Sequence, residues 1–89
     1  MQMDAETGFN GYQNYDTWLV SVFLSNVQWL YESARKMLFE EQAAYRADRL
    51  ETWVRYWGID QWMDKQIKGH TLNITVVNWD EIVEVMTEL

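Results

Sequence analysis

Apolar residues in the first part of the chain recur at the spacing of a helix. Residues 15–27 carry apolar side chains three and four positions apart, and further apolar residues fill most positions between them, so the predicted helix is apolar on most sides. Such a helix is usually central to its domain. Asn14 is predicted to cap it, Asp16 suits its first turn, and Asn26 is the first break. The stripe that defines it is Tyr15, Trp18, Leu19, Val22 and Asn26.

Two apolar stripes of different phase follow between Val27 and Trp57, a stretch without Gly or Pro. The first stripe is Leu30, Ala34, Met37 and Leu38. The second is Ala43, Ala47, Leu50, Val54 and Trp57. Either one helix of about 30 residues runs through, or two helices meet near residues 41–46, and the second alternative is closer to usual helix lengths.

The pattern then predicts a short helix and an extended segment. Gly58 can end the preceding helix in the left-handed cap position, Asp60 can begin the next, and Gly69 ends it. The apolar side of this helix is predicted to be Trp62, Met63, Gln66 and Ile67. Residues 71–77 are β-branched and partly alternating, which indicates an extended connector over the core, with an edge available for pairing.

The last element is the clearest amphipathic helix. Asn78 is a cap, and Glu81 follows three residues later as in a capping box. The apolar stripe is Trp79, Ile82, Val83, Met86 and Leu89. The opposite face is wholly acidic and consists of Asp80, Glu81, Glu84 and Glu88.

These elements predict an all-α fold, a small bundle of about four helices with one extended segment (71–77) before the last helix. Residues 1–13 are polar with two glycines and are interpreted as a flexible or loosely docked arm, which leaves 14–89 as a single helical domain.

Composition and charge argue against several classes of function. The 89 residues carry a net charge of -7, which argues against direct binding of nucleic acid. The first 34 and the last 21 residues each hold four acids and no base, while the middle holds all seven bases against six acids. No apolar run approaches the ~20 residues of a membrane span, and the start of the chain lacks the apolar core of a signal peptide.

Catalytic and metal-binding patterns are missing from the sequence. Cysteine is absent, and no serine lies in a nucleophile-elbow motif. The single histidine, His70, follows a glycine and is interpreted as an exposed loop residue. Adjacent carboxylates on an exposed helix do not make an acid–base pair. The sequence therefore predicts no enzyme, no cofactor and no metal site.

Six tryptophans are the most distinctive residues. Trp18, Trp57, Trp62 and Trp79 are predicted to lie in the core, since small domains gain most from large side chains. Trp29 and Trp53 fit the stripes less well, and with Tyr12 they are candidate partner-binding residues. The acidic face of Asp80, Glu81, Glu84 and Glu88 is either a solvated helix surface or a docking surface for a basic groove.

The two ends of the chain resemble a family of small uncharacterised proteins encoded by phages, plasmids and other mobile elements. Residues 12–26 (YQNYDTWLVSVFLSN) are similar to its opening pattern Tyr-x-Asn-Tyr-Glu/Asp-Thr-Trp, and residues 77–84 (VNWDEIVE) to its closing pattern. Phe23 and Val83 depart from the residues usual there, Trp and Ala. The resemblance implies no activity and no catalytic residue, but it implies that the first and last helices pack together as a shared scaffold.

The resemblance also implies a genetic context in which small acidic proteins often occupy host defence proteins. The leading hypothesis is a non-catalytic inhibitor of a host nuclease system, of anti-CRISPR or antirestriction type, acting by stoichiometric binding in the host cytoplasm. Its partner would be a CRISPR effector, a restriction enzyme or another protein with a basic surface. The alternative is an accessory interaction or structural module of a phage or plasmid without a defence role. Whether two copies form a homodimer is left open.

Overall fold

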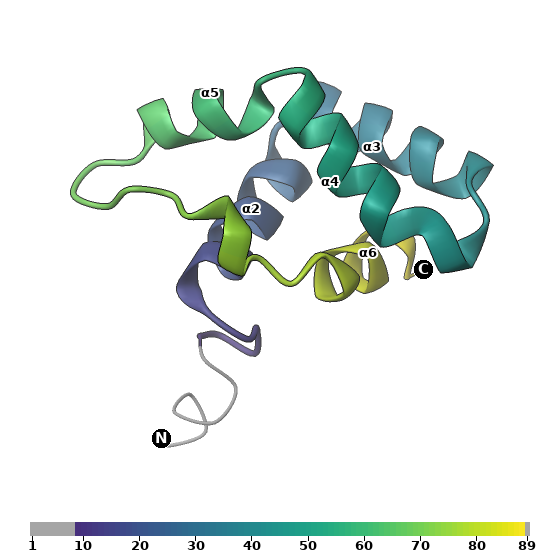
Figure 1. Ribbon diagram of the computed structural model, residues 1–89, viewed down its shortest axis with the longest axis horizontal. Coiled ribbons are helices and arrows are strands. Elements are labelled where there is room, and N and C mark those ends of the chain that lie inside the picture. Colours follow the sequence, from purple (N-terminus) through teal and green to yellow (C-terminus); the bar gives the residue numbers. More distant parts are fainter. Residues whose placement is uncertain (1–8, 89) are drawn as a thin grey trace.

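Helices account for most of the structure, a computed structural model that describes residues 9–88 (Figure 1). The α-helices are α2 (Tyr15–Asn26), α3 (Gln28–Glu40), α4 (Arg46–Tyr56), α5 (Ile59–Gln66) and α6 (Trp79–Thr87). The 3₁₀ turns are η1 (Ala43–Tyr45) and η2 (Ile74–Val76). The described range holds no strand, and the prediction of a small all-α bundle is confirmed.

Helix α2 begins where the sequence predicts but buries only part of the predicted stripe. The Asn14 side chain accepts from the backbone N–H of Thr17 at 2.8 Å, which is an N-cap. Leu19 of the predicted stripe is buried, and the other buried residues are Asp16, Thr17, Val20, Ser21 and Leu24. Two hydroxyls can lie among them because both are hydrogen-bonded, as described below.

The long apolar stretch is divided into two helices, as the length argument favoured. Helix α3 buries the whole of its predicted stripe, and η1 joins it to α4. Leu50 and Val54 of the second stripe are buried. Ala43 is exposed because α4 begins only at Arg46.

Gly58 has a φ of 67°, the left-handed conformation predicted for it, and α5 begins directly after it. The predicted end of α5 at Gly69 was wrong, since the helix ends at Gln66. The predicted extended segment 71–77 was also wrong in part. Asn73 caps a 3₁₀ turn by accepting from the N–H and the hydroxyl of Thr75, so residues 74–76 are helical.

Helix α6 lies at the centre of the packing. It contacts α2, α3 and α4, whereas α5 packs mainly on α4. Trp79, Ile82 and Met86 are buried, as the amphipathic pattern predicts. They join a core formed by residues from all five helices, which includes Leu24, Leu30, Leu38, Leu50, Val54 and Met63.

A tight turn precedes α2. Asn10 and Gly11 both have positive φ, and Phe9 and Tyr12 exchange backbone hydrogen bonds of 2.8 and 2.7 Å across them. Positive φ at both central positions is what a type I′ turn requires. The Phe9 ring contacts the rings of Tyr15 and Trp18. Residues 1–8 of the predicted arm lie outside the described residues.

Candidate functional site

The acidic face of α6 is held in place by its own first turn. The Asn78 side chain accepts from the backbone N–H of Glu81 at 3.2 Å. Glu81 does not complete the capping box, because its carboxylate accepts from the backbone N–H of Gln13 at 2.9 Å. Asp80, Glu84 and Glu88 are exposed and form no ion pair within the described residues. Three of the four predicted acids therefore face outward.

A buried hydroxyl joins the two end segments. Thr17 is fully buried, and its hydroxyl donates to Asn14 at 2.8 Å while it accepts the backbone N–H of Asn78 at 2.9 Å. Asn14 also donates to the backbone carbonyl of Val76, and Asn78 to the side chain of Gln13. The expected packing of the first helix against the last is thus observed, and it fixes the base of the acidic face.

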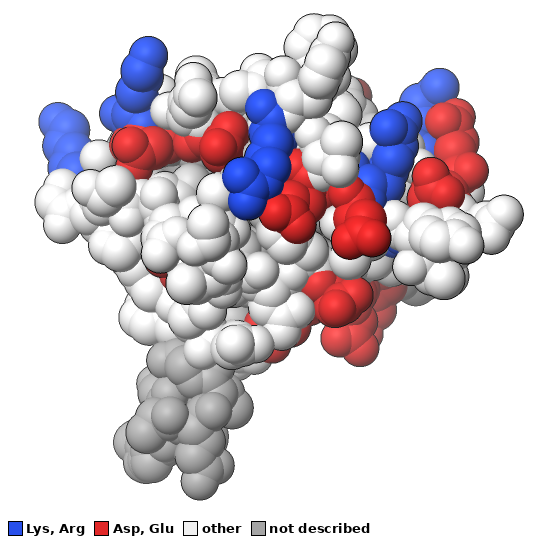
Figure 2. All heavy atoms as spheres, viewed as in Figure 1, with Lys and Arg blue, Asp and Glu red and all other residues white. Residues whose placement is uncertain are grey.

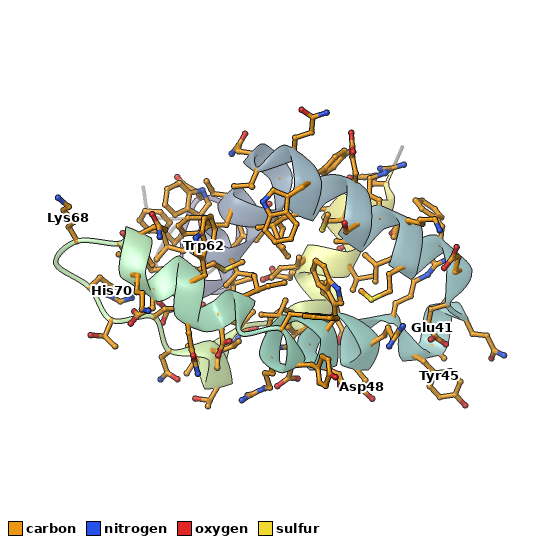
Figure 3. The ribbon with its side chains drawn as sticks, turned by 90° about the horizontal axis from the view of Figure 1, so that it is seen from above. Glu41, Tyr45, Asp48, Trp62, Lys68 and His70 are labelled. Carbon is orange, nitrogen blue, oxygen red and sulfur yellow. The ribbon has the colours of Figure 1, made fainter. Side chains whose placement is uncertain are left out.

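One hollow in the described surface is an aromatic groove that no charged residue lines. It lies where the first turn of α3, the end of α4 and the first residue of α5 meet, at the top of the view in Figure 1. Its volume is about 310 Å³, and its lining residues are Trp29, Ser33, Trp53, Trp57 and Ile59. Figure 3 looks down on this face. The structure thus brings the candidate residues Trp29 and Trp53 together.

Two tryptophans predicted to lie in the core are on the surface instead. Trp57 is 67% exposed because α4 ends one residue before it, and Trp62 is 39% exposed on the outer side of α5. The Trp62 ring, labelled in Figure 3, packs edge-to-face with the ring of Phe23. Trp79 is buried as predicted, and Trp18 is half-buried beside Tyr15.

The aromatic candidates differ in exposure. Trp29 is 58% exposed, while Trp53 is half-buried and packs against the core. Tyr12 is half-buried and its hydroxyl is hydrogen-bonded to that of Ser21 at 2.9 Å, so it belongs to the packing of the N-terminal turn. Sequence reasoning missed Trp57 as a member of the groove. Its position directly before Gly58, which was predicted to end the helix, could have indicated that its side chain lies outside the helical stripe.

His70 is not the exposed loop residue that the sequence predicted. Its side chain is 33% exposed, and its Nε2 lies 2.5 Å from the carboxylate of Asp16, which is buried in the first turn of α2. The ring also meets the Tyr15 ring edge-on. Figure 3 places His70 on the loop after α5. This pair ties the loop to α2, and no serine or other nucleophile is hydrogen-bonded to it within residues 9–88.

Two further hollows are more polar. One, of about 340 Å³, lies between α5 and the segment before α6 and is lined by Asp60, Gln61, Asp64, Lys65, Leu72 and Ile74. The other lies around Tyr45 and Asp48 (Figure 3). No group of three or more potential metal-ligating side chains occurs in the described part of the chain. None of the helices between residues 9 and 88 is long and apolar enough to cross a bilayer.

The chain belongs to a protein family of unknown function, DUF7249, which it matches over residues 5–89. No curated protein and no solved structure matches the chain. The matched range includes both end segments and the groove, and the family has no known function to assign to them.

Proposed function

We propose that this member of the DUF7249 family is a non-catalytic protein of a phage or mobile element that inhibits a host defence nuclease by direct, stoichiometric binding. The observation that carries the proposal is the row of outward carboxylates formed by Asp80 and Glu84 on α6 and by Glu88, the residue directly after the helix. Carboxylates four positions apart on a helix lie ~6 Å from each other along its axis. Such a row can engage the Lys and Arg side chains that line a nucleic-acid channel.

The shape of the molecule supports the proposal. Asn78 and Glu81 hold the first turn of α6, and the helix is packed on three others, so the row is presented on a rigid support. Figure 2 shows acidic atoms below the middle of the molecule, over α6, with no basic atoms beside them, while acidic and basic atoms are interspersed in the upper half. A basic partner would meet one acidic side rather than an evenly charged surface. Action on such a target places the protein in the host cytoplasm.

The decisive experiment titrates the protein against purified restriction enzymes and CRISPR effectors while their DNA cleavage is measured. We expect cleavage to stop at a molar ratio near one, and inhibition to weaken as salt is raised. The double variant Glu84→Lys with Glu88→Lys should lose inhibition. It spares Glu81, which holds Gln13, and Asp80, which suits the helix N-terminus.

The matched control reverses two exposed acids of α3, Glu32→Lys with Glu40→Lys, for the same change in net charge. This control should inhibit as the unmodified protein does. Equal loss of inhibition in both variants would contradict a specific role of α6. Inactivation of the nuclease at a molar ratio far below one would contradict a stoichiometric mechanism. A gel shift of DNA by the protein alone would contradict the prediction that it does not bind nucleic acid, and would explain a loss of cleavage without binding to the nuclease.

The aromatic groove favours the second candidate, an accessory interaction or structural module without a defence role. Exposed indoles are enriched at protein interfaces and do not depend on a basic partner. If no nuclease is inhibited, and the Glu84→Lys and Glu88→Lys variant behaves as the unmodified protein in every assay, this second function is the one that remains.

A further inference from the structure

The surface around the aromatic groove is unusually apolar for a small domain. Trp29, Tyr56 and Trp57 are 58%, 76% and 67% exposed, and the Tyr56 ring meets the Trp57 ring edge-on. A large aromatic side chain buries up to ~250 Å² at an interface, so these three leave on the order of 400 Å² of aromatic surface open. A patch of this size on a single chain is often functional.

Charge distinguishes this face from the rest of the molecule. None of the five groove-lining residues is charged. Two exposed bases of α3 and α4 are paired within their own helices, because Lys36 lies 3.4 Å from Glu40 and Arg55 lies 2.9 Å from Glu51. In Figure 2 the uppermost atoms of the view are uncharged, with basic side chains on either side of them, and the acidic atoms over α6 lie below.

We propose that the groove face, defined by Trp29, Ser33, Trp53, Tyr56 and Trp57, is the surface through which two copies of this chain pair. A protein with a net charge of -7 repels its own copies most strongly where its acids are concentrated. The domain extends 27 Å along its second axis, and charges are screened beyond ~8 Å at physiological salt. The acidic faces of two copies joined at the groove would therefore scarcely oppose the contact.

The size of the patch fits the centre of such an interface. A standard interface buries about 800 Å² on each partner, with an apolar core and a polar rim. The open aromatic surface supplies about half of that area, and the exposed ion pairs on the same two helices, α3 and α4, are available for a polar rim. In a twofold pair the same face serves both chains, so that each groove can receive exposed rings of the other copy.

Pairing through this face leaves α6 free on both chains. The acidic rows would lie at opposite ends of the dimer, since α6 and the groove are on opposite sides of the domain (Figure 1). A dimer of this form would present two acidic faces at once, and two linked sites bind a paired partner more tightly than one. This last consequence depends on the function proposed above, whereas the pairing itself does not.

Sedimentation velocity of the purified full chain, from low to high micromolar concentration, tests the proposal. We expect the mass to rise from 10.7 kDa toward twice that value. The double variant Trp29→Ala with Trp57→Ala should stay at the mass of one chain, and Ser33→Asp should do the same because it places a carboxylate in the groove. All three positions are exposed, so the far-ultraviolet circular dichroism should be unchanged.

Tyr45→Ala is the matched control, since Tyr45 is 57% exposed but lies in η1, away from the groove. It should pair as the unmodified chain does. A single-chain mass at the highest concentration, or pairing that survives in both groove variants, would overturn the proposal. Nuclease inhibition by a groove variant that stays monomeric would leave the proposed function intact, so the two ideas fail separately.

Discussion

Single polar side chains join segments that are far apart in the sequence. The Thr17 hydroxyl both donates to Asn14 and accepts from Asn78, and it is fully buried. Near it, the buried carboxylate of Asp16 meets His70, which is 54 positions later in the chain. A buried polar group that loses its partner costs about 1–3 kcal/mol, so each of these contacts affects stability more than its size indicates.

Replacing Thr17 with Val tests the first contact. The side chain keeps its shape, but the backbone N–H of Asn78 loses its acceptor in a buried position. We expect the free energy of unfolding to fall by about 1–3 kcal/mol. For a domain of this size each kcal/mol lowers the melting temperature by about 4–8 °C. The partly exposed Thr87→Val, which removes only a bond within α6, is the control and should change the melting temperature little.

A double-mutant cycle on Asp16 and His70 tests the second contact. His70→Ala and Asp16→Asn should each destabilise the fold in urea titrations at one fixed pH. The double variant should lose less than the sum of the two, by about 0.5 kcal/mol or more, because the residues share one interaction. Strict additivity would show that the pair contributes nothing, and that the loop after α5 is held by other contacts.

At the scale of elements, two helices receive their C-terminal caps from arginines outside their last turns. Neither α3 nor α6 has a basic residue in its own last turn. Arg46 donates to the carbonyl of Leu38 at 2.7 Å and of Glu41 at 3.2 Å, and Arg35 donates to that of Met86 at 2.9 Å. Both guanidinium groups also lie over the Phe39 ring. The exposed Phe39 is thereby a structural residue, not a free anchor.

Arg46→Ala should therefore cost more than the loss of an ordinary surface arginine. It removes hydrogen bonds to the carbonyls of Leu38 and Glu41 at the end of α3 as well as a contact with an aromatic ring, and we expect a loss of about 1–2 kcal/mol in the free energy of unfolding. Arg55→Ala breaks only a pair within α4 and should cost about 0.3–0.5 kcal/mol. Chemical denaturation of the two variants side by side measures the difference. Equal losses would contradict the capping role.

Local signals explain which elements the sequence predicted well. Helices α2 and α6 were recognisable because Asn14 and Asn78 cap them. Gly58 marked the boundary between α4 and α5. The end of α5 was not, since an eight-residue helix gives too few positions to define a stripe. Asn10–Gly11 is the residue pair that a type I′ turn prefers. The turn was missed because residues 1–13 were interpreted from their polar composition alone.

The site was less predictable than the fold, for a physical reason. An aromatic residue has the same apolar character whether it faces the core or a partner, so spacing could not separate Trp57 and Trp62 from the buried Trp79. Trp29 and Trp57 line the same groove because of how three helices meet. The Asp16–His70 pair depends on the path of the loop after α5. Both are tertiary facts that no local pattern contains.

At the scale of the whole molecule, the helices contribute unequally to cooperativity. Helix α6 lies between α2, α3 and α4, and its Ile82 is fully buried. Helix α5 packs mainly on α4 and is followed by a loop without regular structure between Ile67 and Asn73. We therefore expect the acidic face to stand on the part of the domain that opens last, and the groove to border on the part that opens first.

Native-state hydrogen exchange should resolve these two parts. Amides of α6 should exchange only through global unfolding, while those of α5 should exchange through a smaller opening of lower free energy. Ile82→Ala and Met63→Ala both empty fully buried positions, and each should cost about 2–5 kcal/mol locally. Ile82→Ala should lower protection in all helices together. Met63→Ala should lower amide protection first in α5. An equal loss of protection in all helices of this variant would mean that the domain opens as one unit.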